Sequence, residues 1–393
     1  RKVFIMKLSR RRTNCMKASI LVGLCVCITG CTNTDYIECR MNDERQKLTD
    51  VEIRSISDND IVQNKVLQNG YTMLQWCDVK DVHMFDNDVE HLKDRKVSYN
   101  SFTQWSPEMK EELASVEAYG MDPGLGIRNL HEQGITGKGV SIAIIDQPFD
   151  PNHIEYEGKI REYEIYNTDP KGISMHGPAV TSIAVGENCG VAPDADIYYI
   201  GQSFSDKNGE ANLKDIAKSI DHILEKNDHL ENPVRAISIS IGFMLGDNIE
   251  GTQEWYDAIE RARKKGVLVA TYSMAQNYRY CLDGLTRDLR SDPNEMSSWT
   301  QKNDLRGNVI LVPEDARYFA GYGSSDDYCF FSVGGASWLP PWLVGLYALC
   351  LQVDPDLDSE TFLKYTYDTG YSNGKSMQKI ADPQKLIEYI KTI

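Results

Sequence analysis

The sequence predicts an α/β fold, in which a mostly parallel sheet carries helices on both of its faces. Two observations support this prediction. From about residue 124 onwards, short apolar runs rich in β-branched residues recur, and each is typical of a buried strand. Segments with apolar residues at helical spacing separate these runs, and such alternation is typical of parallel strands joined by crossover helices.

The expected elements follow in chain order. Residues 211–227 and 255–262 show the apolar spacing of amphipathic helices. The long apolar run at 331–350 predicts a buried helix, and we interpret residues 278–308 as an insertion. Strands are expected at residues 139–146, 196–201, 236–242, 266–271 and 308–313.

Charge is unevenly distributed along the chain. The formal net charge of −16 argues against a nucleic-acid partner. Residues 1–30 nevertheless hold seven Lys or Arg and no acidic residue. Within them, residues 18–29 form a 12-residue apolar run, which is too short to cross a bilayer as a helix. This is the pattern of a signal peptide for export.

The residues ITGC at 28–31 resemble a bacterial lipobox, in which the cysteine becomes the lipidated first residue of the mature protein. We therefore expect lipidation of Cys31, export, and anchoring at the extracytoplasmic face of the cell membrane. A plain secretory signal is the alternative. Residues 31–118 are polar and acid-rich, with weak periodicity, and are interpreted as an N-terminal extension or spacer.

Six cysteines follow Cys31 at irregular spacing. The chain contains no CxxC pair and no HExxH motif, so we expect no zinc site and no metal ligands. Calcium binding is left open, although no DxDxDG-type loop is present. Export would permit disulfides, but we expect most of these cysteines to be free, buried thiols.

Three residues with catalytic chemistry lie at the edges of expected elements. Asp146 ends the first strong strand, His176 opens a small-residue helix, and Ser337 precedes the apolar helix. Each has an ordinary structural explanation, as a turn residue, a helix-terminal histidine and a helix cap. Together they also supply the parts of a Ser–His–Asp triad: a nucleophile, a base and a carboxylate that orients the base.

Several motifs in the same order resemble the subtilisin-like serine proteases, or subtilases, from about residue 134 to the end of the chain. GKGVSIAIID is similar to the strand that leads to the family's catalytic Asp, and HGPAV to the motif around its His. GVAPDADI is nearly identical to a family turn and strand, and ISISIG is similar to the strand that pairs with substrate. GGASWLPPWLVGLYAL resembles the helix that carries the family's nucleophile, with Pro341 in register.

The resemblance implies a subtilisin-like, doubly wound fold for residues 119–393, following a signal segment at 1–30. It also implies that Ser337 is the nucleophile, His176 the general base and Asp146 the residue that orients it. Substrate would be an extended polypeptide, paired through its backbone with Ser240, Ile241 and Gly242.

Departures from the family pattern concern mainly the oxyanion hole. The family's DTG, HGT and GTS are DQP, HGP and GAS here, and Met274 stands where the family has an oxyanion-hole Asn. Methionine cannot donate a hydrogen bond. We expect Asn277 to supply the donor, with Gln276 and Ser273 as alternatives.

These features predict a serine endopeptidase that acts on polypeptides at the cell surface through an acyl-enzyme, without a cofactor. The alternative is a catalytically weak or silent subtilase-like lipoprotein that binds peptides or regulates a partner. The order of the motifs disfavours a solute-binding lipoprotein.

Overall fold

The computed structural model describes residues 36–39, 52–85, 89–169, 172–205, 208–242, 249–372 and 377–393. The expected signal segment and Cys31 lie outside these residues, so export and lipidation stay predictions. Within the described residues, the buried side chains form two hydrophobic clusters. The first surrounds the largest sheet, and the second joins the N-terminal part of the chain to residues such as Tyr318 and Phe330.

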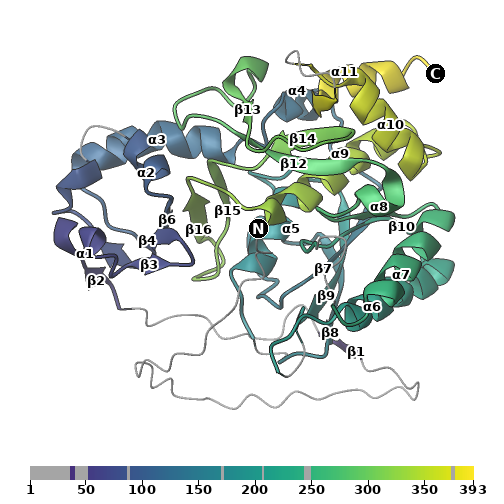
Figure 1. Ribbon diagram of the computed structural model, residues 1–393, viewed down its shortest axis with the longest axis horizontal. Helices are drawn as coiled ribbons and strands as arrows, with labels where there is room; N and C mark the ends of the chain where they lie inside the picture. The colour runs from purple at the N-terminus through teal and green to yellow at the C-terminus, as the bar shows by residue number, and fades with distance from the viewer. Residues whose placement is uncertain are drawn as a thin grey trace.

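A six-stranded sheet with the order β1-β8-β9-β7-β10-β11 forms the centre of the first cluster (Figure 1). The strands run parallel except β1, which pairs antiparallel with β8. Every residue of β7 is buried, as expected for a central strand covered on both faces. The strands are β1 (Tyr36–Glu38), β7 (Ser141–Asp146), β8 (Ile160–Tyr166), β9 (Asp196–Gln202), β10 (Val234–Ser238) and β11 (Leu268–Ala270).

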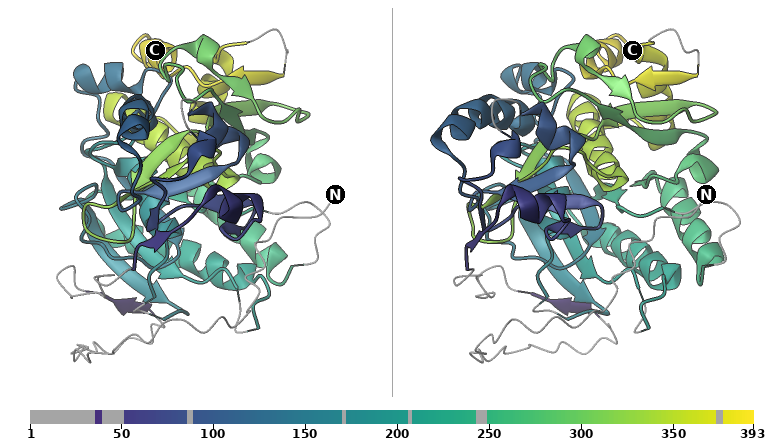
Figure 2. Two further views of the ribbon diagram at one scale, coloured as in Figure 1. Left: turned by 90° about the vertical axis from the view of Figure 1, so that its left-hand side faces the viewer. Right: turned by 60° about the vertical axis from the view of Figure 1, so that its left-hand side comes forward.

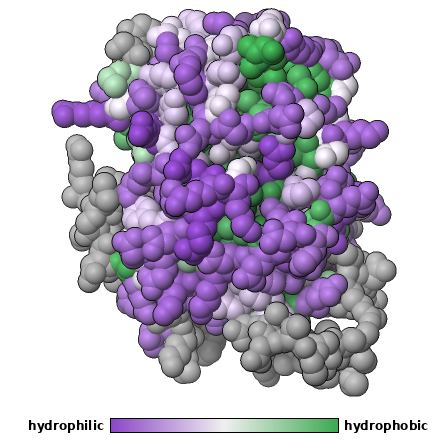
Figure 3. All heavy atoms as spheres, turned by 90° about the vertical axis from the view of Figure 1, so that its right-hand side faces the viewer, coloured by the Kyte–Doolittle hydropathy of each residue, from purple (hydrophilic) through white to green (hydrophobic). Residues whose placement is uncertain are grey.

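Helices cover both faces of this sheet. α5 (His176–Val185) packs with α9 (Leu339–Val353), and α6 (Leu213–Lys226) packs with α7 (Thr252–Lys264). α5 and α9 are buried nearly throughout and therefore apolar all round. α6 and α7 bury one face each, and the side of the molecule that they cover is mostly hydrophilic (Figure 3). The α/β fold class predicted from the sequence is confirmed.

A second, four-stranded sheet has the order β13-β12-β14-β17, and β12, β14 and β17 run parallel in it. β12 lies within residues 278–308, the stretch interpreted from the sequence as an insertion. β12 is a complete partner of β14, and its side chains are mostly buried. The strands of this sheet are β12 (Cys281–Thr286), β13 (Thr300–Gln301), β14 (Val309–Pro313) and β17 (Gln378–Ile380). The remaining helices of this part of the chain are α4 (Ile127–Glu132), α8 (Ala275–Tyr278), α10 (Ser359–Thr369) and α11 (Pro383–Ile390). Two short 3-10 turns are η2 (Asn227–His229) and η3 (Met296–Ser298).

The N-terminal part forms a third sheet together with a hairpin from the main domain, in the order β15-β16-β6-β4-β3 (Figure 2). β6 pairs antiparallel with β16 and parallel with β4, so strands far apart in sequence are neighbours. A two-stranded sheet of β2 and β5 completes this part. The elements of the N-terminal part are β2 (Arg54–Ser55), α1 (Asp58–Val62), β3 (Leu67–Gln68), β4 (Tyr71–Met73), β5 (Cys77–Asp78), η1 (His83–Phe85), α2 (Glu90–Asp94), β6 (Val97–Asn100) and α3 (Pro107–Met121). The hairpin from the main domain consists of β15 (Arg317–Ala320) and β16 (Tyr328–Phe331).

Residues 52–85 and 89–121 are thus packed against the main domain, and they do not have the form of a solvated spacer. Leu74, Val97 and Tyr99 are at most 4% exposed and share the second cluster with Tyr318 and Phe330. Polar composition concealed this packing, because polar residues separate the buried apolar ones, as Ser98 separates Val97 from Tyr99.

Two further features concern α9 and the cysteines. Among the described residues, only the stretch Ala336–Val353 is long and apolar enough to cross a membrane, and 78% of it is buried inside the fold. Among the described residues, Cys77, Cys189, Cys281, Cys329 and Cys350 are free thiols, and all of these except Cys281 are buried, as expected.

Candidate active site

Asp146 and His176 form a hydrogen-bonded pair at the carboxyl end of β7. His176 Nδ1 donates to Asp146 Oδ1 over 2.6 Å, and the backbone N–H of Gln147 donates to the same oxygen over 2.7 Å. The Asp146 side chain is fully buried, whereas that of His176 is 18% exposed. Burial lowers the pKa of His176, but the charge and the hydrogen bond of Asp146 raise it more, so the net shift is upwards.

Local packing explains why the histidine reaches the carboxylate. Gly177 begins the body of α5, and a Cβ there would lie 2.5 Å from the carbonyl oxygen of Gln147. Only glycine therefore lets the first turn of α5 approach the chain that follows β7. Ser174 accepts a hydrogen bond from the backbone N–H of His176 over 3.0 Å and also contacts the side chain of Gln147. Sequence reasoning missed Ser174, although it lies two residues before the histidine.

Ser337 lies in the 3-10 turn η4 (Ala336–Trp338), which leads directly into α9. It is partly exposed, and no side-chain hydrogen bond caps the helix that follows. The carbonyl oxygen of Ser337 accepts a hydrogen bond from Ser240 Oγ over 2.7 Å. The ordinary explanation of Ser337 as a helix cap therefore does not describe its side chain.

The turn that carries Ser337 lies beside His176. The rings of His176 and Trp338 have centroids 5.6 Å apart, and α5 contacts η4. Among the hydrogen bonds between described residues, none joins the hydroxyl of Ser337 to His176. The structure thus joins the carboxylate to the imidazole directly and brings the serine turn next to that pair.

Ser240, Ile241 and Gly242 follow the carboxyl end of β10, next to the Ser337 turn. A Cβ at Gly242 would lie 2.3 Å from the ring of Tyr272, so the backbone at this glycine lies directly against that ring. Burial raises the pKa of Tyr272 in this position. Tyr272 therefore bridges the end of β11 and the segment expected to pair with substrate, a contact that sequence reasoning did not identify.

Met274 is 1% exposed and belongs to the first hydrophobic cluster. Asn277 lies three residues later in α8, and its Oδ1 is buried without a hydrogen-bond partner. Ser273 is engaged with Thr271, its backbone N–H donating to the Thr271 hydroxyl over 3.2 Å. The role of Asn277 in an oxyanion hole stays a prediction. Among the described residues, no cluster of three or more His, Cys, Asp or Glu could hold a metal ion.

Comparisons with known proteins point to one family. Residues 137–274 match the model of the subtilase family, Peptidase_S8. The chain is 25% identical over 295 residues to the serine protease AprX of Bacillus subtilis, covering 64% of each chain. It is 28% identical over 137 residues to the subtilisin-like protease PopC of Myxococcus xanthus, covering 30% of this chain and 28% of PopC. The chain thus spans under two thirds of these relatives.

Solved structures with the same architecture agree with this match. The prenylagaramide maturation protease PagA superimposes with a TM-score of 0.51 at 16% identity, covering 67% of this chain and 98% of PagA. A serine-to-alanine mutant of the PatA protease domain gives a TM-score of 0.50 at 20% identity, covering 66% of this chain and 98% of that domain. The fold is subtilisin-like, and the chain is related to serine-type peptidases.

Proposed function

We propose that this protein is a serine endopeptidase, in which Ser337 attacks the peptide bond of a polypeptide substrate. The observation that supports this most directly is the Asp146–His176 hydrogen bond at 2.6 Å, beside the turn that carries a partly exposed serine. A buried carboxylate that fixes the imidazole tautomer leaves Nε2 free to act as a base.

The reaction follows from these groups. Neutral His176 takes the hydroxyl proton of Ser337 as the oxygen attacks the scissile carbonyl, and later gives that proton to the leaving amine. Asp146 stabilises the imidazolium between these two steps. Water then attacks the acyl-enzyme, and His176 acts again as base and then as acid in this second half of the reaction. Ser337 precedes a 15-residue helix, whose N-terminal dipole favours the negative charge that develops at this end.

The decisive experiment is active-site labelling of purified protein with a serine-reactive phosphonate, followed by an assay on unfolded casein. The wild type should label and cleave, and Ser337→Ala should do neither, with turnover reduced by at least roughly 1000-fold. Ser115→Ala is the matched control, because its exposed hydroxyl only donates to Glu112 O within α3. A wild type that neither labels nor cleaves would remove the enzyme proposal.

A catalytically silent peptide-binding protein is the second proposal. It is favoured by buried Met274 at the expected donor position and by the lack of a hydrogen bond between Ser337 and His176 among described residues. Phosphonate labelling of the wild type against Ser337→Ala separates the two, and Asn277→Ala then tests the oxyanion donor. If Asn277 is the oxyanion donor, its loss should lower kcat by roughly 100-fold or more with KM nearly unchanged. Gln276→Ala and Ser273→Ala test the alternative donors.

We further propose export and lipid anchoring through Cys31, motivated by the basic segment, the short apolar run and ITGC. Cys31→Ala should move the protein from the membrane fraction to the soluble fraction. Unchanged detergent-dependent fractionation of this variant would contradict lipidation.

A further inference from the structure

The backbone of Gly334, three residues before Ser337, is held from two directions. Its N–H donates to Asp315 Oδ1 over 2.7 Å. Its carbonyl oxygen accepts from Lys302 Nζ over 3.3 Å and from the Tyr71 hydroxyl over 3.4 Å. Both polar groups of one peptide residue are therefore bound by side chains from other parts of the chain.

The charged groups around this glycine are largely buried. Glu314 and Asp315 are 5% and 2% exposed, and Lys302 Nζ lies 2.7 Å from Glu314 and 2.8 Å from Asp315. Burial raises the pKa of Glu314 to about 7, although the charge of Lys302 opposes the rise. Removing one member of such a group leaves an uncompensated buried charge, so each partner depends on the others.

Close packing adds to these contacts. A Cβ at Gly334 would lie 2.0 Å from the carbonyl oxygen of Glu314. The turn therefore lies directly against the segment that supplies the two carboxylates. Both the hydrogen bonds and the packing restrict the path of the chain from β16 to Ser337.

We infer that Asp315 and Lys302 are positioning residues, which fix the turn carrying Ser337 by holding both backbone polar groups of Gly334. We call Asp315, Lys302 and Gly334 the Gly334 clamp. This inference rests on the proposed function, because the clamp acts on catalysis only through Ser337. Misplacing a reacting group by about 1 Å can cost on the order of 100-fold in rate. A clamp only three residues before the nucleophile therefore has a measurable effect on kcat.

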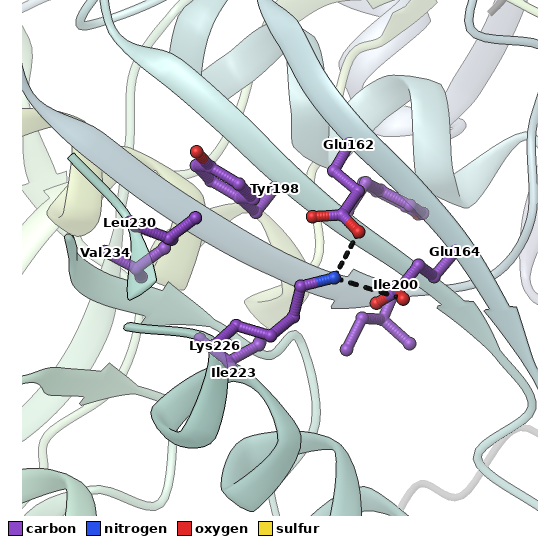
Figure 4. Close-up of a pocket in the computed structure, with 9 residues that line it drawn as sticks. Glu162, Glu164, Tyr198, Ile200, Ile223, Lys226, Leu230 and Val234 are labelled. Carbon is purple, nitrogen blue, oxygen red and sulfur yellow. Dashed lines mark hydrogen bonds and ion pairs between the residues drawn. The ribbon is translucent and has the colours of Figure 1, made fainter. Parts of the chain in front are cut away.

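The molecule offers a matched control outside the Gly334 clamp. Lys226 likewise lies between two carboxylates, Glu162 and Glu164, with its Nζ 3.1 Å from Glu164 (Figure 4). Its side chain is 25% exposed, against 21% for Lys302. Lys226 touches neither Gly334 nor the Ser337 turn in any hydrogen bond between described residues. Lys226→Met therefore reports the cost of losing such a lysine without affecting the clamp.

The test compares Lys302→Met, Asp315→Ala and Lys226→Met with the wild type. Lys302→Met and Asp315→Ala should lower kcat by roughly 10- to 100-fold with KM changed less than about 2-fold, because substrate contacts remain. Lys226→Met should leave kcat unchanged. Asp315→Asn keeps an acceptor oxygen for the Gly334 N–H, so its kcat should fall between those of Asp315→Ala and the wild type. It also replaces Asp315→Ala if that variant does not fold.

Amide hydrogen exchange across residues 332–338 gives a readout that does not need activity. The clamp variants should exchange faster in this segment, and Lys226→Met should not. The inference is overturned if Lys302→Met and Asp315→Asn keep wild-type kcat and exchange, or if Lys226→Met reproduces their effects. An inactive wild type would contradict the proposed function, while exchange alone would still decide whether the clamp holds the turn.

Discussion

The two hydrophobic clusters differ in how they are encoded. The cluster around the six-stranded sheet comes from runs of consecutive buried residues, such as β7, in which all six are buried. The second cluster draws single residues from distant parts of the chain, including Leu74 in the N-terminal part and Phe330 in β16. Continuous burial is visible in a sequence, whereas burial assembled from separate residues becomes visible only in the folded molecule.

The two regions also contribute differently to the site. The first cluster carries Asp146 and His176. The second holds the chain that leads to Ser337: Ser332 donates its N–H to Val97 O over 3.0 Å and its hydroxyl to Leu92 O over 2.8 Å. The Asp146–His176 pair therefore depends on the first region, whereas the turn that carries the proposed nucleophile Ser337 depends on both, because Trp338 in that turn belongs to the first cluster.

The largest expected effect comes from removing the second region. A chain starting at residue 122 loses β6, the antiparallel partner of β16, and leaves the apolar side chains of β15 and β16 uncovered. We expect this chain to be insoluble or inactive, whereas a control chain starting at residue 52 should keep both its solubility and its activity. Soluble expression, circular dichroism and phosphonate labelling measure this. An active soluble fragment starting near Gly124 would identify residues 32–118 as a removable propeptide.

The sequence predicted most of the first region, because strand and helix patterns were long enough to read. All five expected strands exist within a few residues of their expected bounds, for example β9 at Asp196–Gln202. The residue types at the ends of these elements predicted that Asp146 and His176 lie together, and the two side chains are hydrogen-bonded.

The second region could not be read in the same way. β3, β4 and β6 contain two to four residues each, too few to show a period. The Gly334 clamp unites Lys302 and Asp315 with a glycine in a different loop, and no spacing in the sequence links them. Contacts that form between separate segments have no local signature.

The pH dependence of activity should separate the titration of His176 from that of Glu314, which lies beside the Gly334 clamp. His176 must be neutral to act as a base, and Asp146 raises its net pKa, so activity should rise with pH above the usual histidine range. Glu314, with a pKa of about 7, faces Lys302, Asp315 and Asp283, and it pairs with Lys302 only when ionised. Both effects favour higher pH.

Glu314→Gln should lower the plateau of kcat severalfold and remove the inflection near pH 7, leaving the one that belongs to His176. Profiles of kcat against pH for the two proteins measure this. Profiles of the same shape would show that Glu314 does not act on the Ser337 turn.

A pair of core substitutions sharpens the comparison further. Phe330 in β16 and Phe362 in α10 are both fully buried, one in each cluster. Each Phe→Ala change should cost about 3–5 kcal/mol of unfolding free energy, measured by urea denaturation. Only Phe330→Ala should also lower kcat, because β16 leads into the Ser337 turn. Equal kcat for both variants would contradict a link between the second cluster and catalysis.

The smallest expected effect concerns a single hydroxyl group that joins the two regions. Tyr71 in β4 donates to Gly334 O over 3.4 Å, and this carbonyl also accepts from Lys302. Tyr71→Phe removes one of two donors and keeps the ring, which packs edge-on against Phe331 at 5.2 Å. We expect kcat to fall about 2- to 5-fold and the unfolding free energy by about 1 kcal/mol or less. Tyr347→Phe is the control, because its hydroxyl also donates to a backbone carbonyl, Leu357 O, over 2.7 Å, but away from the turn. It should cost at least as much stability and leave kcat unchanged. If Tyr347→Phe lowers kcat as much as Tyr71→Phe does, the hydroxyl of Tyr71 contributes stability alone, and the N-terminal part acts on the site only through β6 and β16.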